Sequence, residues 1–173
     1  EEPAREAGGT DGVYFVPAFT GLGAPHWDQR ARATIVGMTR GTERSHIVRP
    51  TLESIAFQTR DVTEAMQQDA DIDLTSLRVD GGAVKNNFLC QLQANIMDSE
   101  IVRPVVDETT ALGSAYAAGL AVGYWETLDE LRDNWQIDRE FAPDADSKSD
   151  VDRRYGRWGE AVERSKDWAR DEE

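Results

Sequence analysis

The residues best suited to chemistry form the segment 80–87, which reads Asp-Gly-Gly-Ala-Val-Lys-Asn-Asn. Adjacent glycines let a backbone approach a ligand closely, and the free N–H groups and positive dipole end of a helix start attract anions. Open α/β sheets bind ligands at such turns between a strand and a helix. The segment is therefore a candidate nucleotide site. The alternative is that Gly81 and Gly82 form only a tight turn and that Asn86 or Asn87 only caps a helix.

The elements around this segment follow from hydrophobic periodicity. Leu77 and Val79 alternate with charged residues, which predicts a strand that ends at the two glycines. A helix is expected from about Asn86, because its apolar residues recur at helical spacing. A strand over 101–106 and a helix over 111–122 follow. The small residues of that helix predict close packing against neighbouring elements.

Further elements flank this central part. We predict a strand at 13–19, where Pro17 suits an edge or a strand end, then a glycine-rich loop and a second strand at 33–38. A long amphipathic helix is expected over 50–67, with Pro50 in its first turn. Thr127 and Glu130 have the spacing of a capping box. A last helix carries an apolar stripe that should pack on the domain; its members are Tyr155, Trp158, Ala161, Val162, Ser165 and Trp168.

The order of these elements predicts the fold class. Strands and helices alternate through the central part of the chain, which indicates an α/β domain. Right-handed crossovers between successive strands would place the strands mainly parallel, with helices on both faces of the sheet.

The composition limits the range of partners. The chain has 173 residues, with 33 acidic and 19 basic side chains and a net charge of -14, so nucleic acid and anionic membranes are poor partners. No apolar run is long enough to cross a membrane and no signal peptide is evident, so a cytoplasmic location is expected. Acidic residues scattered along the chain and basic residues that are nearly all arginine suggest a salt-loving organism. An ordinary acidic cytosolic protein is the alternative.

Several other reactive side chains receive structural interpretations. His26 and His46 lie far apart without a nearby cysteine, so a zinc site is not expected, and His46 is assigned to a helix start. Asp28 is expected to fix its loop by a hydrogen bond. Cys90, the single cysteine, is expected to be buried. Lys85 either lies near phosphates or points into water.

Four segments together resemble the FGGY family of carbohydrate kinases. They are GVYFVPAFTGLGAPHWD (12–28), IVGMTRGTERSHIVRPTLESIAFQTRDVTEAM (35–66), LRVDGGAVKNNF (77–88) and ETTALGSAYAAGLAVGYW (108–125). The order and spacing are those of the family's C-terminal part, and the resemblance extends over 12–168. The wording of the third segment is most similar to the glycerol kinase branch. Pro50 departs from the family signature, which usually has Ala or Ser there.

The resemblance implies a fold, a reaction and a set of contacts. The fold would be a partial actin-like (ribonuclease-H-like) ATPase domain that lacks its first strands. The reaction would be the transfer of a phosphoryl group from ATP, with Mg²⁺, to glycerol. The nucleotide would contact Gly82 and Asn86, and Gly81 and Ala83 would frame the loop. The family's catalytic base and its glycerol contacts lie upstream of these segments, so no catalytic or metal-binding residue is assigned here, and the chain by itself is expected to be inactive.

Two alternatives remain beside this interpretation. The chain could belong to a family member that acts on xylulose or gluconate, or to an actin-like binding module without catalysis. We divide the chain into a polar segment (1–11), a partial kinase domain (12–142) and a C-terminal helix that packs on it (143–173). The full-length enzyme is expected to be a homo-oligomer.

Overall fold

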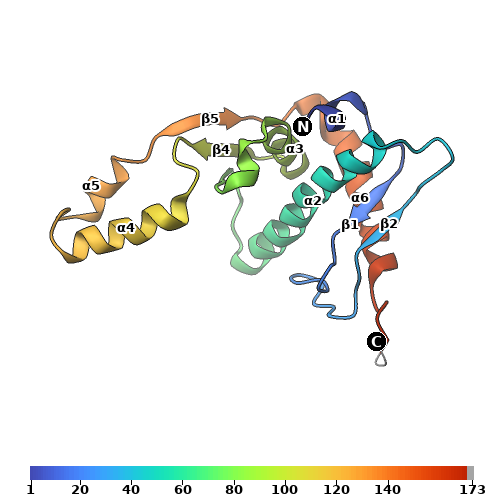
Figure 1. Ribbon diagram of the computed structural model, residues 1–173, viewed down its shortest axis with the longest axis horizontal. Coiled ribbons are helices and arrows are strands. Elements are labelled where there is room, and N and C mark those ends of the chain that lie inside the picture. The colour runs from blue at the N-terminus through green and yellow to red at the C-terminus, as the bar shows by residue number, and fades with distance from the viewer. Residues whose placement is uncertain (171–173) are drawn as a thin grey trace.

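The computed structural model describes residues 1–170, and Figure 1 shows a main body from which one arm extends. The elements, in chain order, are α1 (Glu2–Glu6), β1 (Tyr14–Val16), β2 (Thr34–Val36), α2 (Ser45–Ala70), β3 (Ser76–Arg78), the 3₁₀ turn η1 (Gly82–Lys85), α3 (Asn87–Met97), β4 (Glu100–Pro104), α4 (Thr109–Ala121), α5 (Leu128–Arg132), β5 (Ile137–Phe141), the 3₁₀ turn η2 (Ala145–Ser147) and α6 (Lys148–Ser165). Among these residues, no helix is both long and apolar enough to cross a membrane.

The strands form two small sheets. β1 and β2 pair antiparallel, while β3, β4 and β5 form a second sheet in that order. β3 and β4 are parallel and are connected through α3, as predicted. However, β4 and β5 are antiparallel, so the prediction of a mainly parallel sheet is wrong. β5 was not predicted because its sequence, Ile-Asp-Arg-Glu-Phe, places charged residues at three successive positions, and only Phe141 is buried.

Helix α2 begins earlier than predicted. It starts at Ser45, so Pro50 lies inside the helix and is buried, rather than in the first turn. A proline at this place lacks the N–H that would bond to the carbonyl four residues earlier. Just before the helix, the Glu43 amide donates a hydrogen bond to Nδ1 of His46 at 3.1 Å. His46 therefore lies at a helix start, as expected.

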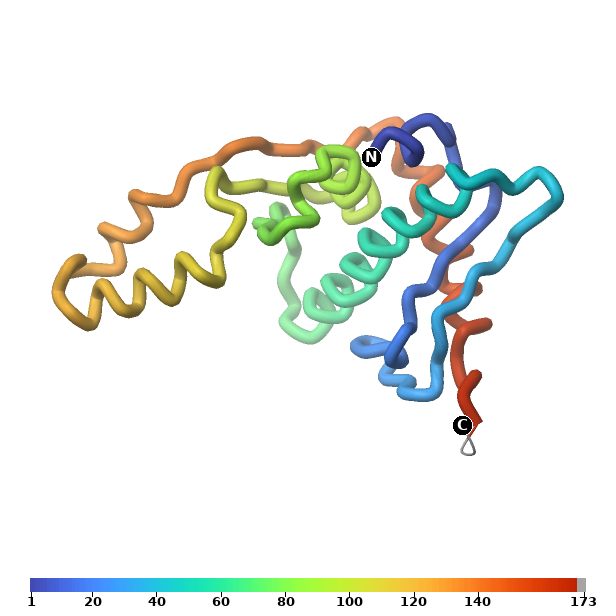
Figure 2. The backbone as a smooth tube through the Cα atoms, in the orientation of Figure 1, coloured from blue at the N-terminus to red at the C-terminus, as the bar shows by residue number. Residues whose placement is uncertain are grey.

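The main core lies between α2, α6 and the β1–β2 pair. Trp158 of α6 is almost fully buried, and its ring stacks on Phe57 of α2 with 5.4 Å between the ring centroids. Val16 and Val162 complete the same cluster. The predicted stripe of α6 is thus confirmed, except that Trp168 lies beyond the helix and is 66% exposed. In Figure 2 the path of α6 runs beside β1 and β2, and α6 contacts both strands.

The N-terminal residues also have structure. Helix α1 packs against α2 and buries Ala4, and the guanidinium of Arg5 lies 5.2 Å from the ring centroid of Phe88 at the start of α3. The expected polar segment therefore contains a short helix, while the proposed division of the chain into three parts stays a prediction.

Helices α4 and α5 form the arm. In Figure 1 they project away from α2 and α6, and α4 has no buried residue. The prediction that the small residues of α4 pack closely against neighbouring elements is therefore wrong for the described residues. The exception is Gly119, over which the ring of Trp125 lies directly. Thr127 caps α5 through a hydrogen bond from the Glu130 amide at 3.3 Å, as predicted. The Glu130 side chain accepts from the Glu126 amide rather than from Thr127, so the capping box is shifted by one residue.

Candidate functional site

The glycine loop lies between β3 and α3. Beyond β3, Gly81 has φ +86°, a conformation that favours glycine, and its amide donates to the carbonyl of Asp107 at 2.7 Å. The chain then makes the 3₁₀ turn η1, in which the Val84 amide donates to the Gly81 carbonyl at 3.2 Å. The predicted connection of a strand end to a helix start through two glycines is therefore confirmed.

Gly82 differs from Gly81 in what its surroundings require. Its φ lies outside the positive range, and a Cβ built at this position would have no heavy atom within 4 Å among the described residues. Neither backbone conformation nor internal packing therefore requires a glycine at position 82. A glycine in open space beside a helix start leaves room for a ligand to approach the backbone.

Asn86 is the N-cap of α3. Its Oδ1 accepts hydrogen bonds from the amides of Phe88 and Leu89, at 3.0 and 3.1 Å. The capping interpretation is therefore correct as geometry. Both bonds use the oxygen, and no hydrogen bond from Nδ2 to another described residue is found. Ligand binding by Asn86 remains a prediction.

Two residues behind the loop were not recognised in the sequence. Arg103 of β4 donates from Nη1 to the carbonyl of Val84 at 2.7 Å and to Oδ1 of Asn87 at 2.9 Å. Asp107 holds the loop through its carbonyl, which accepts from Gly81. Their contacts join positions 16 or more residues apart, so no local pattern marks them.

Lys85 pairs with Asp107 at 2.9 Å, although its side chain is 69% exposed. This hydrogen bond raises the pKa of Lys85 and lowers the pKa of Asp107. The side chain therefore reaches solvent but is held by a carboxylate. An exposed pair of this kind contributes little to stability and is broken easily, so an approach of Lys85 to phosphates remains a prediction.

Of the other residues singled out in the sequence, Cys90 contacts this loop, while Asp28 and His26 have partners elsewhere. Asp28 fixes its own loop as expected, because its Oδ1 accepts from the Arg30 amide at 2.8 Å and its Oδ2 from the Asp167 amide at 2.8 Å. Cys90 is buried, and its thiol contacts the Val84 carbonyl. Nε2 of His26 lies 3.3 Å from Oδ2 of Asp61. Within residues 1–170, no group of three or more His, Cys, Asp or Glu side chains could hold a metal ion.

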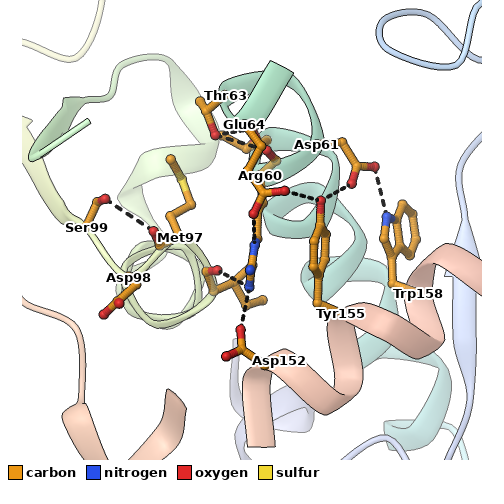
Figure 3. A network of polar contacts seen from close by, with 12 residues as sticks. Arg60, Asp61, Thr63, Glu64, Met97, Asp98, Ser99, Asp152, Tyr155 and Trp158 are labelled. Atoms are coloured by element: carbon orange, nitrogen blue, oxygen red, sulfur yellow. Dashed lines mark hydrogen bonds and ion pairs between the residues drawn. The ribbon is translucent and has the colours of Figure 1, made fainter. Parts of the chain in front are cut away.

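Asp61 organises a polar network, drawn in Figure 3, that holds α6 against α2. It accepts hydrogen bonds from Nε1 of Trp158 at 2.9 Å and from the hydroxyl of Tyr155 at 2.7 Å. Burial, together with the carboxylates of Asp61 and Glu64, raises the pKa of Tyr155. The guanidinium of Arg60 lies 4.0 Å from the centroid of the Tyr155 ring. Every side chain in this network has a partner inside the fold, so we assign the network to structure rather than to binding.

A second charged contact between α2 and α6 is made by Glu53, eight residues before Asp61 in α2. Glu53 is 2% exposed and lies between Nε of Arg49, at 2.9 Å, and Nη1 of Arg154 from α6, at 2.8 Å. Two guanidinium groups therefore compensate one buried carboxylate, as a buried charge requires.

Comparison with known proteins identifies the family. Residues 2–122 match the C-terminal domain of the FGGY family of carbohydrate kinases. The chain is 79% identical to a glycerol kinase of Haloferax volcanii over 172 residues and 72% identical to a glycerol kinase of Haloquadratum walsbyi over 171 residues. Each match covers 99% of this chain and 33% of the relative. Both relatives come from salt-loving archaea, in agreement with the prediction from composition.

Solved structures agree with this assignment. A crystal structure of Plasmodium falciparum glycerol kinase with ADP matches 95% of this chain and 33% of that chain, with a TM-score of 0.83 and 41% identity. The gluconate kinase of Lactobacillus acidophilus matches 92% of this chain and 32% of that chain, with a TM-score of 0.78 and 26% identity. The chain thus spans about one third of the relatives it matches. The partial actin-like α/β fold is confirmed, and the chain belongs to the FGGY family of carbohydrate kinases, of which it represents the C-terminal domain.

Proposed function

We propose that this chain is the ATP-binding portion of a glycerol kinase, an enzyme that transfers the γ-phosphoryl group of ATP to glycerol and releases sn-glycerol 3-phosphate and ADP. The observation that carries the proposal is the loop between β3 and α3, where Gly82 lies in open space beside a helix start. The similarity to glycerol kinases, one of them solved with ADP, supports it.

In this proposal each loop residue has a separate role. Gly81 supplies the turn and Ala83 the small side chain that frame the site, while Gly82 lets the nucleotide approach the backbone. Asn86 uses its oxygen for the α3 cap and its amide nitrogen for the nucleotide. Because phosphoryl transfer depends mainly on positioning and charge stabilisation, this chain contributes by orienting ATP. The base that accepts the glycerol proton is assigned to the part of the kinase outside these residues.

Mg²⁺ is proposed as the companion of the ATP phosphates. The described residues offer no cluster of carboxylates that could hold it, and the loop itself supplies only Asp80 as a charged oxygen ligand. We therefore assign no Mg²⁺ ligand in this chain and derive no step through the ion.

Two related functions compete with this one. Solved gluconate and xylulose kinases match the chain with TM-scores of 0.78 and 0.76, but at 26% and 25% identity, well below the similarity to glycerol kinases. Relative rates of the full-length protein on glycerol, xylulose and gluconate distinguish the three. A non-catalytic actin-like module would phosphorylate none of them. We further propose a cytoplasmic, homo-oligomeric enzyme, and light scattering tests the oligomer.

The nucleotide site is tested in a hybrid kinase. We define the hybrid kinase as the Haloferax volcanii relative with its C-terminal third replaced by this chain, an exchange that 79% identity makes practicable. Gly82→Val should raise the KM for ATP at least tenfold, because a branched side chain would fill the open space, and should leave the KM for glycerol within about twofold. Equal damage to both KM values would show that the loop is structural. The chain alone should show no glycerol-dependent release of ADP, and such release would contradict the proposal.

A further inference from the structure

Arg103 of β4 contacts the loop at two points. This side chain is only 14% exposed. Its Nη1 donates to the Val84 carbonyl at 2.7 Å and to Oδ1 of Asn87 at 2.9 Å. These acceptors lie on the two sides of Asn86 in the sequence, one in the turn η1 and one in the first residue of α3. A single guanidinium therefore fixes both segments that flank the N-cap.

The other edge of the same guanidinium is anchored in β5. Nε and Nη2 of Arg103 lie 2.8 and 2.6 Å from Oδ2 of Asp138. The plane of the group also lies near the ring of Phe141, 5.5 Å from its centroid. The planar fork of arginine serves both sets of partners at once, while the ammonium group of a lysine is a point charge without this geometry.

The turn needs this external support. A 3₁₀ turn has poorer hydrogen-bond geometry than an α-helix, and η1 spans only Gly82–Lys85. Its Val84 carbonyl accepts from Arg103 and from the Cys90 thiol at 3.3 Å, so the turn is tied both to β4 and to α3. The Lys85–Asp107 pair also spans the loop, but the Lys85 side chain is exposed. The contacts of Arg103 with Val84 and Asn87 are partly buried, and salt therefore screens them less.

We infer that Arg103 is a positioning residue for nucleotide binding: it sets the direction in which Asn86 and the backbone at Gly82 face the nucleotide. The inference rests on the proposed function of the loop. Arg103 does not touch the ligand in this arrangement, because its donors are directed to Val84, Asn87 and Asp138. Its replacement should therefore change nucleotide affinity without removing any nucleotide contact.

The chain offers a matched control in Arg139. Arg139 lies opposite Arg103 in the β4–β5 register, and its guanidinium lies 4.8 Å from the centroid of the same Phe141 ring. No described hydrogen bond or ion pair joins it to the glycine loop. Arg139→Lys therefore changes the same residue type in the same sheet while leaving the loop contacts intact.

The test compares Arg103→Lys and Arg139→Lys in the hybrid kinase by calorimetric titration of ADP, melting temperature and the KM for glycerol. Arg103→Lys should bind ADP roughly tenfold more weakly, and Arg139→Lys should stay within about twofold of the wild type. The KM for glycerol should change less than about twofold in both, because the acceptor site lies elsewhere. A merely structural role would shift the melting temperature and both substrates together.

The outcomes separate this inference from the proposed function. If the unmodified hybrid kinase does not bind ADP, the proposed function fails first and the inference fails with it. If it binds ADP and Arg103→Lys binds equally well, or if both variants lose the same affinity, only the inference is overturned. If Arg103→Lys lowers the melting temperature strongly, the variant Asp138→Asn provides the test. It keeps the contacts of Arg103 with Val84 and Asn87 and weakens only the pairing of Arg103 with Asp138. Weaker ADP binding at unchanged melting then supports the inference, and unchanged binding overturns it.

Discussion

The substitution Asn86→Asp separates the two roles that Asn86 combines. In the structure, Oδ1 caps α3 by accepting from two amides at 3.0 and 3.1 Å. An aspartate oxygen accepts the same bonds, and its charge suits the positive end of the helix dipole. The free energy of unfolding should therefore stay within about 0.5 kcal/mol of the wild type.

The effect on nucleotide binding should be large. The substitution removes the Nδ2 donor and places a carboxylate beside a polyanion. Two like charges about 4 Å apart repel by about 1 kcal/mol in bulk water and about 4 kcal/mol near a protein surface. We take the lower part of this range and expect ADP to bind at least roughly tenfold more weakly, which corresponds to about 1.4 kcal/mol.

Titration calorimetry of ADP into the hybrid kinase and its variants, at matched KCl concentration, measures this loss. Asn87→Asp is the control, since it adds the same charge one residue further on, where Oδ1 already pairs with Arg103. It should weaken ADP binding much less than Asn86→Asp. Unchanged affinity together with unchanged melting in Asn86→Asp would reduce Asn86 to an ordinary helix cap.

Three further predictions concern the stability of the 173-residue chain, measured by urea unfolding. Gly37→Ala should cost about 2–4 kcal/mol, because φ at Gly37 is +88° and a Cβ there would lie 2.0 Å from a backbone oxygen. The control Gly159→Ala should be neutral or stabilising, because a Cβ at Gly159 would lie in open space. Glu53→Ala should cost about 3–5 kcal/mol, because it removes the buried carboxylate that pairs with the partly buried Arg49 and Arg154, and the exposed Glu160→Ala should cost less than about 0.5 kcal/mol. The pKa of Asp28 is lowered chiefly by the hydrogen bond from the Asp167 amide, so its stabilising contribution is present at neutral pH and is lost as the pH falls below its ordinary value of 3.8. The advantage of the wild type over Asp28→Asn should shrink in that range, and an advantage independent of pH would contradict the assignment.

The elements with strong periodicity could be predicted from the sequence. Apolar residues recur at regular spacing in α6 and in the strand and helix on either side of Gly81. The local sequence pattern was therefore sufficient to predict these elements. β5 could not be predicted from its sequence, because its stability comes from pairing with β4 rather than from an apolar face of its own. The start of α2 was predicted too late, because tertiary packing allows Pro50 inside the helix and the local sequence does not reveal this packing.

The candidate site could be predicted only in part. The loop was found because its glycines and asparagines are consecutive. Its support was missed because Arg103 follows Asn87 by 16 residues and precedes Asp138 by 35. The two partners of Asp61 in α6 are still more distant, at 94 and 97 residues. Such contacts depend on the three-dimensional arrangement of elements that periodicity identifies but does not place.

The two groups of polar contacts allow stability and binding to be changed separately. Asp61 and Glu53 join α2 to α6, two helices of the main body in Figure 1. The loop is supported instead by Arg103 and Asp138, which belong to β4 and β5. Because the two groups share no residue, substitutions in them should be nearly additive. A variant that combines Arg103→Lys with Glu53→Gln should therefore show the ADP affinity of the first and the urea stability of the second, and a large deviation from additivity would show that the sheet and the helical body act as one unit.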